Sequence, residues 1–176
     1  NIQILNVEEN TIFNFDKNKK VKPEPYIGKY YADISEESYL KYFKEKYQKI
    51  DLNYIKNYFE KSEFNDNSIL FISLTDSNFE ESDVNFKINF TKKITFSILE
   101  DEYLKQALKN ENNYLFLKIR KEAFLNTIYN KRSWEDISIG FQNRQYRKPN
   151  IYNSDFWFHF SNKYVSTKYV QSTTDC

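Results

Sequence analysis

The sequence has few of the residues that carry most enzyme chemistry. Its 176 residues include one histidine, one cysteine, two glycines, three prolines and no methionine. His159 and Cys176 alone are too few for a zinc site built from histidine and cysteine ligands. Gly28 and Gly140 cannot supply a glycine-rich phosphate loop, and one cysteine excludes a disulfide within the chain.

Long apolar runs and a strong excess of one charge are also absent. No stretch approaches the roughly 20 apolar residues of a membrane helix, and no signal-peptide pattern opens the chain. The net charge of +1 gives no reason to expect nucleic acid or an anionic membrane as a partner. We therefore expect a cytoplasmic location. The lack of methionine, at position 1 as elsewhere, favours a piece of a longer translation product.

Aromatic residues, by contrast, are abundant. They make up 19% of the chain, with 16 phenylalanines and 15 tyrosines. Each buried aromatic ring removes roughly 150–250 Å² from water, so a core is expected although the mean hydropathy is −0.80. The length fits one domain. We expect an N-terminal strand or extended arm at 1–34 and an α+β domain at 35–176.

Apolar spacing predicts the first elements. Loose alternation within 1–15 predicts one or two short strands, and the lysine- and proline-rich segment 16–31 is typical of an exposed connector. Helical spacing then predicts a helix from Ser35 to about residue 50. Asp51 is expected to cap a second helix.

A change of period then predicts a mainly antiparallel sheet of about five strands. The continuous apolar run 69–74 is typical of a strand buried on both faces. Two alternating runs with a short polar break predict an antiparallel hairpin. The predicted elements are strands at 84–90, 94–98 and 115–119, a short helix or turn at 103–108, and a helix at 121–130 capped by Asn130.

The stretch from Lys131 to Phe160 contains both tryptophans. Ser133 and Asp136 have the spacing of a capping box. Alternation at 137, 139 and 141 predicts a strand that ends at the Arg-Lys-Pro of 147–149. Ser154 is expected to cap a short aromatic helix with Phe156, Trp157 and Phe160. We expect Trp134, Gly140, Pro149 and Trp157 to be structural anchors of this stretch, with both tryptophans buried.

Four residues in this stretch are candidates for binding a substrate or lining an interface. Arg144 and Arg147 carry planar guanidinium groups, which suit phosphate or carboxylate. Tyr152 can flank a ligand, and His159 is the remaining candidate. The alternatives are ordinary surface charges for the arginines and a packing histidine for His159. Two strand residues three apart lie on opposite faces, so both arginines share a side only if the strand is bent.

The long spaced pattern of this stretch resembles the C-terminal region of the CMP-N-acetylneuraminate hydroxylase family and of related metallo-β-lactamase-fold proteins. Upstream segments at 55–59, 66–74 and 84–90 look similar to the same region. The matching positions are Trp134, Ile139-Gly140-Phe141-Gln142, Arg144, Arg147, Pro149, Ile151-Tyr152, Phe156-Trp157 and His159-Phe160.

The resemblance implies that the chemistry lies elsewhere in a larger protein. In that family a metallo-β-lactamase-type domain with a His/Asp-rich metal motif is catalytic, and the hydroxylase adds a Rieske iron–sulphur domain. Both precede the matched region, and this sequence has neither motif. No catalytic residue or metal ligand is therefore assigned here. A binuclear metal or an iron–sulphur centre is expected in the parent protein, a metal-dependent hydrolase or oxygenase.

The expected function is that of a C-terminal accessory domain. It would pack on a missing N-terminal catalytic domain and shape the substrate entrance or a homo-oligomer interface, without being an enzyme alone. A looser likeness in shape to sterol-carrier-protein type modules leaves a lipid- or small-ligand-binding module as an alternative. A ligand-free interaction domain is another. A large apolar cavity would favour the lipid module, and a filled core with an exposed aromatic patch would favour the interaction domain.

Overall fold

A computed structural model describes residues 12–14, 19–21 and 36–165, and the chain divides into two units between Tyr39 and Leu40. In the first unit β1 (Ile12–Asn14) pairs antiparallel with β2 (Lys19–Val21). The predicted connector at 16–31 was therefore wrong for 19–21, because a ladder is made by the backbone and accepts lysine side chains. The rest of that connector lies outside the described residues. The domain limits 1–34 and 35–176 stay predictions.

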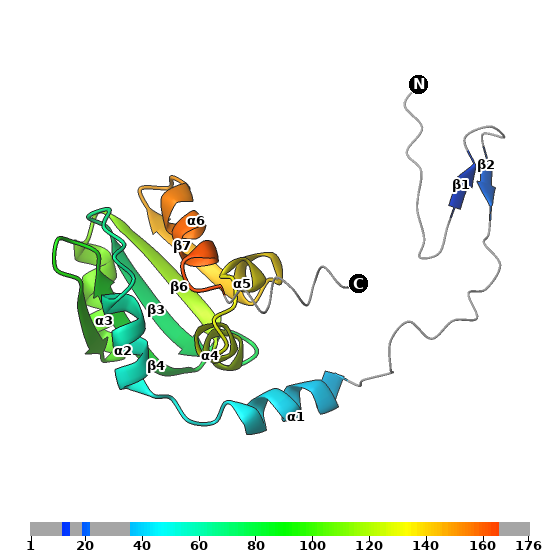
Figure 1. Cartoon of the computed structure of the whole chain (residues 1–176), viewed down its shortest axis with the longest axis horizontal. Helices are drawn as coiled ribbons and strands as arrows, with labels where there is room; N and C mark the ends of the chain where they lie inside the picture. Colours follow the sequence, from blue (N-terminus) through cyan, green and yellow to red (C-terminus); the bar gives the residue numbers. More distant parts are fainter. Residues whose placement is uncertain (1–11, 15–18, 22–35, 166–176) are drawn as a thin grey trace. The chain divides into compact units, whose positions relative to one another are not determined.

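The second unit is built on a five-stranded sheet with the order β5-β4-β3-β6-β7 (Figure 1). β3 (Ile69–Thr75) is central and pairs antiparallel with β4 (Ser82–Asn89) and parallel with β6 (Tyr114–Arg120). β5 (Thr95–Leu99) and β7 (Asn143–Lys148) form the edges and are antiparallel to their neighbours. The predicted α+β class with a mainly antiparallel sheet is confirmed.

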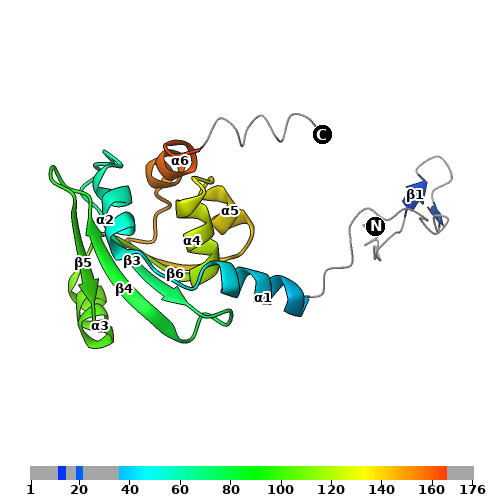
Figure 2. The same cartoon turned by 60° about the horizontal axis from the view of Figure 1, so that its bottom comes forward.

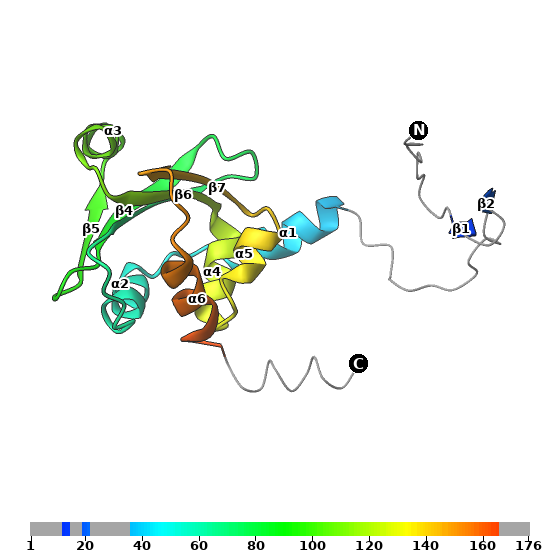
Figure 3. The same cartoon turned by 90° about the horizontal axis from the view of Figure 1, so that it is seen from above.

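Helices cover the two faces of this sheet unequally (Figure 3). One face carries α2 (Leu52–Glu60), α4 (Lys121–Tyr129), α5 (Glu135–Ile139) and α6 (Ser154–Asn162), whose apolar residues share one large core. The other face carries α3 (Asp101–Asn110), which buries Leu104 against Phe71 and Phe116. α1 (Glu36–Lys46) precedes α2 and packs Phe43 on the large core.

Alternation in β3 explains how one strand serves both cores. Leu70, Ile72 and Leu74 face the large core and are at most 1% exposed, whereas Phe71 faces α3. Side chains of successive strand residues point to opposite faces, so a strand covered on both sides is apolar throughout. The prediction of a strand buried on both faces at 69–74 is confirmed.

Trp134 lies at the centre of the large core and is fully buried. Its ring contacts aromatic rings from α2, α4 and α6 at centroid distances of 5.1–6.1 Å, with several edge-to-face pairs. Trp157 is 5% exposed and lies 6.4 Å from Trp134. Both tryptophans are buried as predicted, and they join α6 to the segment that precedes α5.

The strand predicted from Ile137 to the Arg-Lys-Pro of 147–149 was wrong in its first half, because no residue of 137–141 is in a strand. Residues 135–139 form α5, in which Ile137 is buried while Ile139 is 72% exposed, and Phe141 beyond it is 81% exposed. Three alternating apolar residues are too short a pattern to separate a strand from a single helical turn. The actual strand, β7, reads NRQYRK and has no apolar alternation. It forms because the edge of β6 offers backbone partners.

Two predicted caps differ from the structure, and two are as expected. The hydroxyl of Ser133 accepts from the amide of Glu135 instead of Asp136, so no capping box forms. Asn153, not Ser154, caps α6, and its Oδ1 accepts from the amide of Phe156 at 2.9 Å. The predicted Asp51 cap of α2 is present, since its Oδ1 accepts from the amide of Tyr54 at 2.9 Å. Asn130 ends α4.

Candidate functional site

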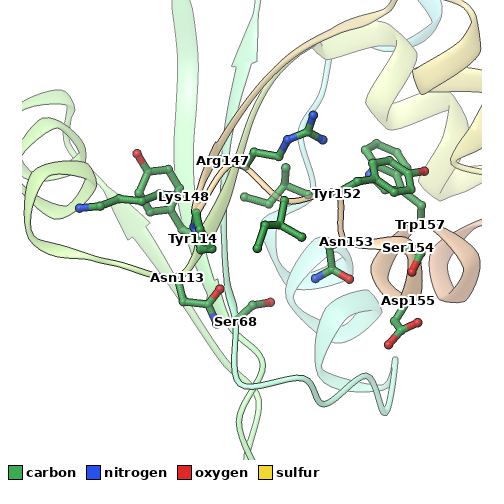
Figure 4. Close-up of a pocket in the computed structure, with 13 residues that line it drawn as sticks. Ser68, Asn113, Tyr114, Arg147, Lys148, Tyr152, Asn153, Ser154, Asp155 and Trp157 are labelled. Atoms are coloured by element: carbon green, nitrogen blue, oxygen red, sulfur yellow. The ribbon is translucent and has the colours of Figure 1, made fainter.

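An open pocket of about 320 Å³ lies where β6 and β7 meet the start of α6 (Figure 4). Its wall includes Arg147, Tyr152 and Trp157 from the stretch 131–160, and Ser68 and Asn113 from the ends of loops before β3 and β6. Two of the four candidate residues, Arg147 and Tyr152, therefore lie in one site. The structure does not bring Arg144 or His159 into it.

Strand geometry decides which arginine reaches the pocket. Arg147 is the register partner of Leu115, whose side chain belongs to the large core, whereas Arg144 is the partner of Lys118. The two arginines therefore lie on opposite faces, as the spacing of three predicts. Pro149 then ends β7, after a cis Lys148–Pro149 peptide bond, and the chain turns towards α6.

Arg147 is held in place, while its terminal nitrogens have no hydrogen-bond partner in the described part of the chain. Its Nε donates to Oδ1 of Asn150 at 3.1 Å, and the guanidinium carbon lies 5.8 Å from the centre of the Tyr152 ring. Among the described residues, no carboxylate pairs with it. The two terminal nitrogens can therefore donate to a carboxylate or phosphate of a ligand.

Trp157 supplies a further donor at the pocket wall. The residue is 5% exposed, and in the part of the chain that is described its indole N–H has no hydrogen-bond partner. Trp134 differs, because its indole N–H donates to the hydroxyl of Tyr58 at 2.8 Å. A buried indole usually finds a polar partner, so the Trp157 N–H is suited to a ligand acceptor.

Two residues of the pocket wall, Ser68 and Asn153, belong to a hydrogen-bond network that the sequence did not reveal. Nδ2 of Asn153 donates to Oδ2 of Asp66 at 2.7 Å, and Oδ1 of Asp66 accepts from both the amide and the hydroxyl of Ser68. This network ties the start of α6 to the loop before β3. The residues are far apart in sequence and follow no motif, so only the fold brings them together.

A second hollow of about 310 Å³ shares Tyr152, Ser154 and Trp157 with the first and is also lined by Ile139 and Phe158. Large apolar side chains line these two hollows. Ile139, Ile151, Tyr152 and Phe158 are 72%, 69%, 59% and 75% exposed. We refer to these four residues as the α5–α6 patch. Clustered exposed apolar side chains mark interaction or ligand sites more often than scattered ones do.

The remaining candidates have structural contacts. Nε2 of His159 lies 2.8 Å from the carbonyl oxygen of Ser62, and its ring packs 5.1 Å from that of Phe64. The guanidinium carbon of Arg144 lies 4.2 Å from the centre of the Phe79 ring. A Cβ added to Gly140 would come within 2.6 Å of the carbonyl oxygen of Asp136. Binding roles for His159 and Arg144 stay predictions.

The described residues contain no group of three or more His, Cys, Asp or Glu side chains that could hold a metal ion. Within the same residues, no helix has the length and apolar character needed to cross a membrane.

Sequence comparison finds similar proteins in several animals. Over 141 residues it is 28% identical to the cytidine monophosphate-N-acetylneuraminic acid hydroxylase of Macaca mulatta, a match covering 80% of this chain and 21% of that protein. The chain is thus similar to this hydroxylase over most of its length. The Homo sapiens protein described as inactive is also 28% identical over 141 residues, and that of Danio rerio is 27% identical over 136 residues.

The coverage is strongly asymmetric. The chain spans about a fifth of the length of the curated relatives it matches, with 21% of the Macaca mulatta and 20% of the Danio rerio protein aligned. No protein-family model matches the chain. No solved structure matches it at a significant level.

Proposed function

We propose that this chain is a C-terminal accessory domain of a larger cytoplasmic enzyme related to the CMP-N-acetylneuraminate hydroxylases. The observation that carries the proposal is the match over 80% of this chain but only 21% of the relative. In the proposed arrangement a metallo-β-lactamase-fold catalytic domain performs the chemistry. The present domain packs on it and shapes the entrance for the substrate.

The region around the pocket is the part of the surface that best suits this role. The α5–α6 patch provides exposed apolar area that would gain from burial against a neighbouring domain. Arg147 and Tyr152 lie beside it, and interface centres are enriched in arginine and aromatic residues. A pocket at the rim of such an interface is in position to contact a substrate on its way to the catalytic domain.

The chemistry of the pocket also fits the substrate class named by the relatives. Cytidine monophosphate-N-acetylneuraminic acid contains acidic groups, and the free guanidinium nitrogens of Arg147 suit a carboxylate or phosphate. The indole N–H of Trp157 adds a neutral donor, and Tyr152 adds an aromatic wall. In this proposal Arg147 orients an anionic substrate and takes no part in bond breaking. A metal or iron–sulphur centre would be held by the catalytic domain.

The test uses the full-length parent protein, with Arg147→Ala and Arg144→Ala compared. Both residues are arginines of β7, but only Arg147 lines the pocket. We expect Arg147→Ala to lower kcat/KM by about tenfold or more, as the loss of one charged hydrogen bond of about 1.5–3 kcal/mol predicts, with unchanged thermal stability. Arg144→Ala is expected to leave kcat/KM unchanged. Equal activity of both variants and wild type would contradict the proposal.

A ligand-free interaction domain is the second candidate, and the α5–α6 patch favours it. If Arg147→Ala is active but charged substitutions such as Ile139→Lys separate this domain from the rest of the parent, the domain serves only in assembly. The sterol-carrier alternative is less well supported, because aromatic rings pack against one another in the described core and the two hollows above open at the surface. Stoichiometric binding of a fluorescent fatty acid to the chain would support the sterol-carrier alternative.

A further inference from the structure

The two edges of the five-stranded sheet are built differently. β7 carries Arg144, Arg147 and Lys148 and stops at Pro149, and charged residues and proline are features that prevent further pairing of an edge strand. β5 reads TFSIL, without charge, proline or glycine, and its register with β4 has no bulge. In Figure 2, β5 lies at the rim of the sheet, with no described element beyond it.

Backbone directions show which groups β5 presents at this rim. Phe90, just after β4, directs both backbone groups to the β3 side, because its N–H donates to the Ser68 carbonyl at 3.0 Å and its C=O accepts from the amide of Asn67. The backbone N–H and C=O groups of successive strand residues point to alternate sides, so those of Asn89 point to β5, where its register partner is Thr95. The backbone groups of Thr95 therefore point back to β4, and the same alternation continues along β5.

The N–H and C=O groups of Phe96 and Ile98 consequently point away from β4 and towards the open rim. In the described part of the chain, these four backbone groups form no hydrogen bond. The side chain of Ile98 is also 54% exposed. An uncharged edge with free backbone groups and an exposed isoleucine is a template for another strand.

We propose that β5 pairs antiparallel with β5 of a second copy of this chain, about a twofold axis at Ser97. In this register Phe96 of each copy lies opposite Ile98 of the other, so the free backbone groups of these residues meet. The two sheets become continuous, and Ile98 gains an aromatic cross-strand neighbour. A twofold interface uses the same patch on both copies, which a self-complementary strand satisfies.

Charges at the two ends of β5 favour a second copy in this orientation. Lys92 and Lys93 precede the strand, and Glu100, Asp101 and Glu102 follow it. Antiparallel pairing places the lysines of each copy beside the acidic group of the other, whereas parallel pairing would place lysine beside lysine. Neither lysine forms an ion pair with a described residue of its own chain. This complementarity is what selects a copy of the same chain as the partner.

The interface does not depend on the function proposed above. β5 and β7 are opposite edges of the sheet, so pairing through β5 leaves the Arg147 pocket and the α5–α6 patch accessible. A monomeric protein would overturn the interface without affecting the accessory role, and an inactive Arg147 site would leave the interface intact.

The first experiment measures the mass of the 176-residue chain by analytical ultracentrifugation over a concentration series. Wild type is expected to sediment as a dimer of the 21.4 kDa chain. In the Ser97→Lys variant, the new lysines of the two copies lie opposite each other at the twofold axis, while the backbone hydrogen bonds to β4 are kept. We therefore expect the Kd of the dimer to be at least about tenfold higher than that of wild type. Gln145→Lys, in the protected edge β7, is the matched control and is expected to remain dimeric. Circular dichroism checks that each variant is folded.

A charge-swap experiment then tests the orientation without altering the strand. Lys92→Glu/Lys93→Glu and Glu100→Lys/Glu102→Lys chains are each expected to be monomeric alone and to form a mixed dimer when combined. Hydrogen exchange of the Phe96 and Ile98 amides is expected to be slow in the dimer and fast in the monomeric variants. A monomeric wild type, a dimer unaffected by both sets of substitutions, or fast exchange of these amides in a dimer would each overturn the proposal.

Discussion

The indole nitrogen of Trp134 donates a 2.8 Å hydrogen bond to the hydroxyl of Tyr58 in the middle of the large core. Tyr58 comes from α2, and Trp134 immediately precedes α5, so one bond ties together two helices that are distant in sequence. Both groups are polar and buried, and the hydrogen bond between them offsets the free-energy cost of removing them from water. Burial also raises the pKa of the Tyr58 hydroxyl, which keeps it protonated.

We expect Tyr58→Phe to destabilise the chain by about 1–3 kcal/mol, because it leaves the buried indole N–H of Trp134 without an acceptor. Tyr103→Phe is the matched control, since Tyr103 is 62% exposed, and its effect is expected to stay within about 0.5 kcal/mol. Urea denaturation followed by tryptophan fluorescence measures both. Equal denaturation midpoints for the two variants would show that the Trp134–Tyr58 bond adds no stability.

Gly140→Ala is expected to cost about 1–3 kcal/mol, because the new methyl group would lie 2.6 Å from the carbonyl oxygen of Asp136. The clash is with backbone, which a side-chain rotation cannot relieve. Ser138→Ala in the same helix is the control and is expected to be nearly neutral. If thermal unfolding gave Gly140→Ala the stability of wild type, Gly140 would not be the anchor that the sequence suggested.

Arg144 and Phe79 are expected to be coupled. The guanidinium carbon lies 4.2 Å from the ring centre, and such contacts contribute about 0.5–1 kcal/mol at exposed sites. A double-mutant cycle with Arg144→Ala and Phe79→Ala measures this coupling free energy directly. The same cycle with Arg147 in place of Arg144 serves as the control and is expected to give none. A coupling of zero for Arg144 would assign it to ordinary surface charge.

Alkaline pH is expected to weaken the fold through Tyr164. Burial raises the pKa of its hydroxyl to about 12, above the usual value near 10, and the hydroxyl donates to the carbonyl of Tyr58 at 2.6 Å. A pKa that is higher in the folded state gives stability that is complete below pH 10 and is lost as the pH rises towards 12. The free energy of unfolding should therefore fall across this window.

Tyr164→Phe is the control for the alkaline effect, because it removes the titrating hydroxyl. Wild type should lose more stability than this variant between pH 10 and 12, as measured by denaturant unfolding at fixed pH. Tyr58 contributes in the same direction and is present in both proteins, so the difference isolates Tyr164. Parallel pH profiles for the two proteins would contradict the prediction.

The sequence was sufficient where apolar periodicity continued long enough. β3, β4, β5 and β6 lie where 69–74, 84–90, 94–98 and 115–119 were predicted, and Asp51 caps α2. It was insufficient at α5 and β7. Ile137 and Ile139 alternate over too few residues to distinguish a helical turn from a strand, and β7 forms through backbone pairing with β6, which leaves no apolar pattern.

The candidate site was found only in part for a related reason. Arg147 and Tyr152 belong to a dense local cluster of basic and aromatic residues, which the sequence displays directly. Asp66 and Asn113 reach the same pocket region through tertiary contacts, with Asp66 bonded to Asn153. Periodicity places residues on a face of one element, but it does not say which elements meet.

The parallel pairing of β3 with β6 also has a consequence for how the chain folds. Ile69 is the register partner of Tyr114, and β4, β5 and α3 lie between them in sequence. The β3–β4–β5 meander can form from local contacts. Docking of β6 closes a long loop, and the chain loses conformational entropy before the β3–β6 contacts can offset that loss. Until then β3 exposes an apolar edge along its full length. We therefore expect completion of the sheet to be the slowest step of folding and the stage at which the nascent chain is most prone to aggregate.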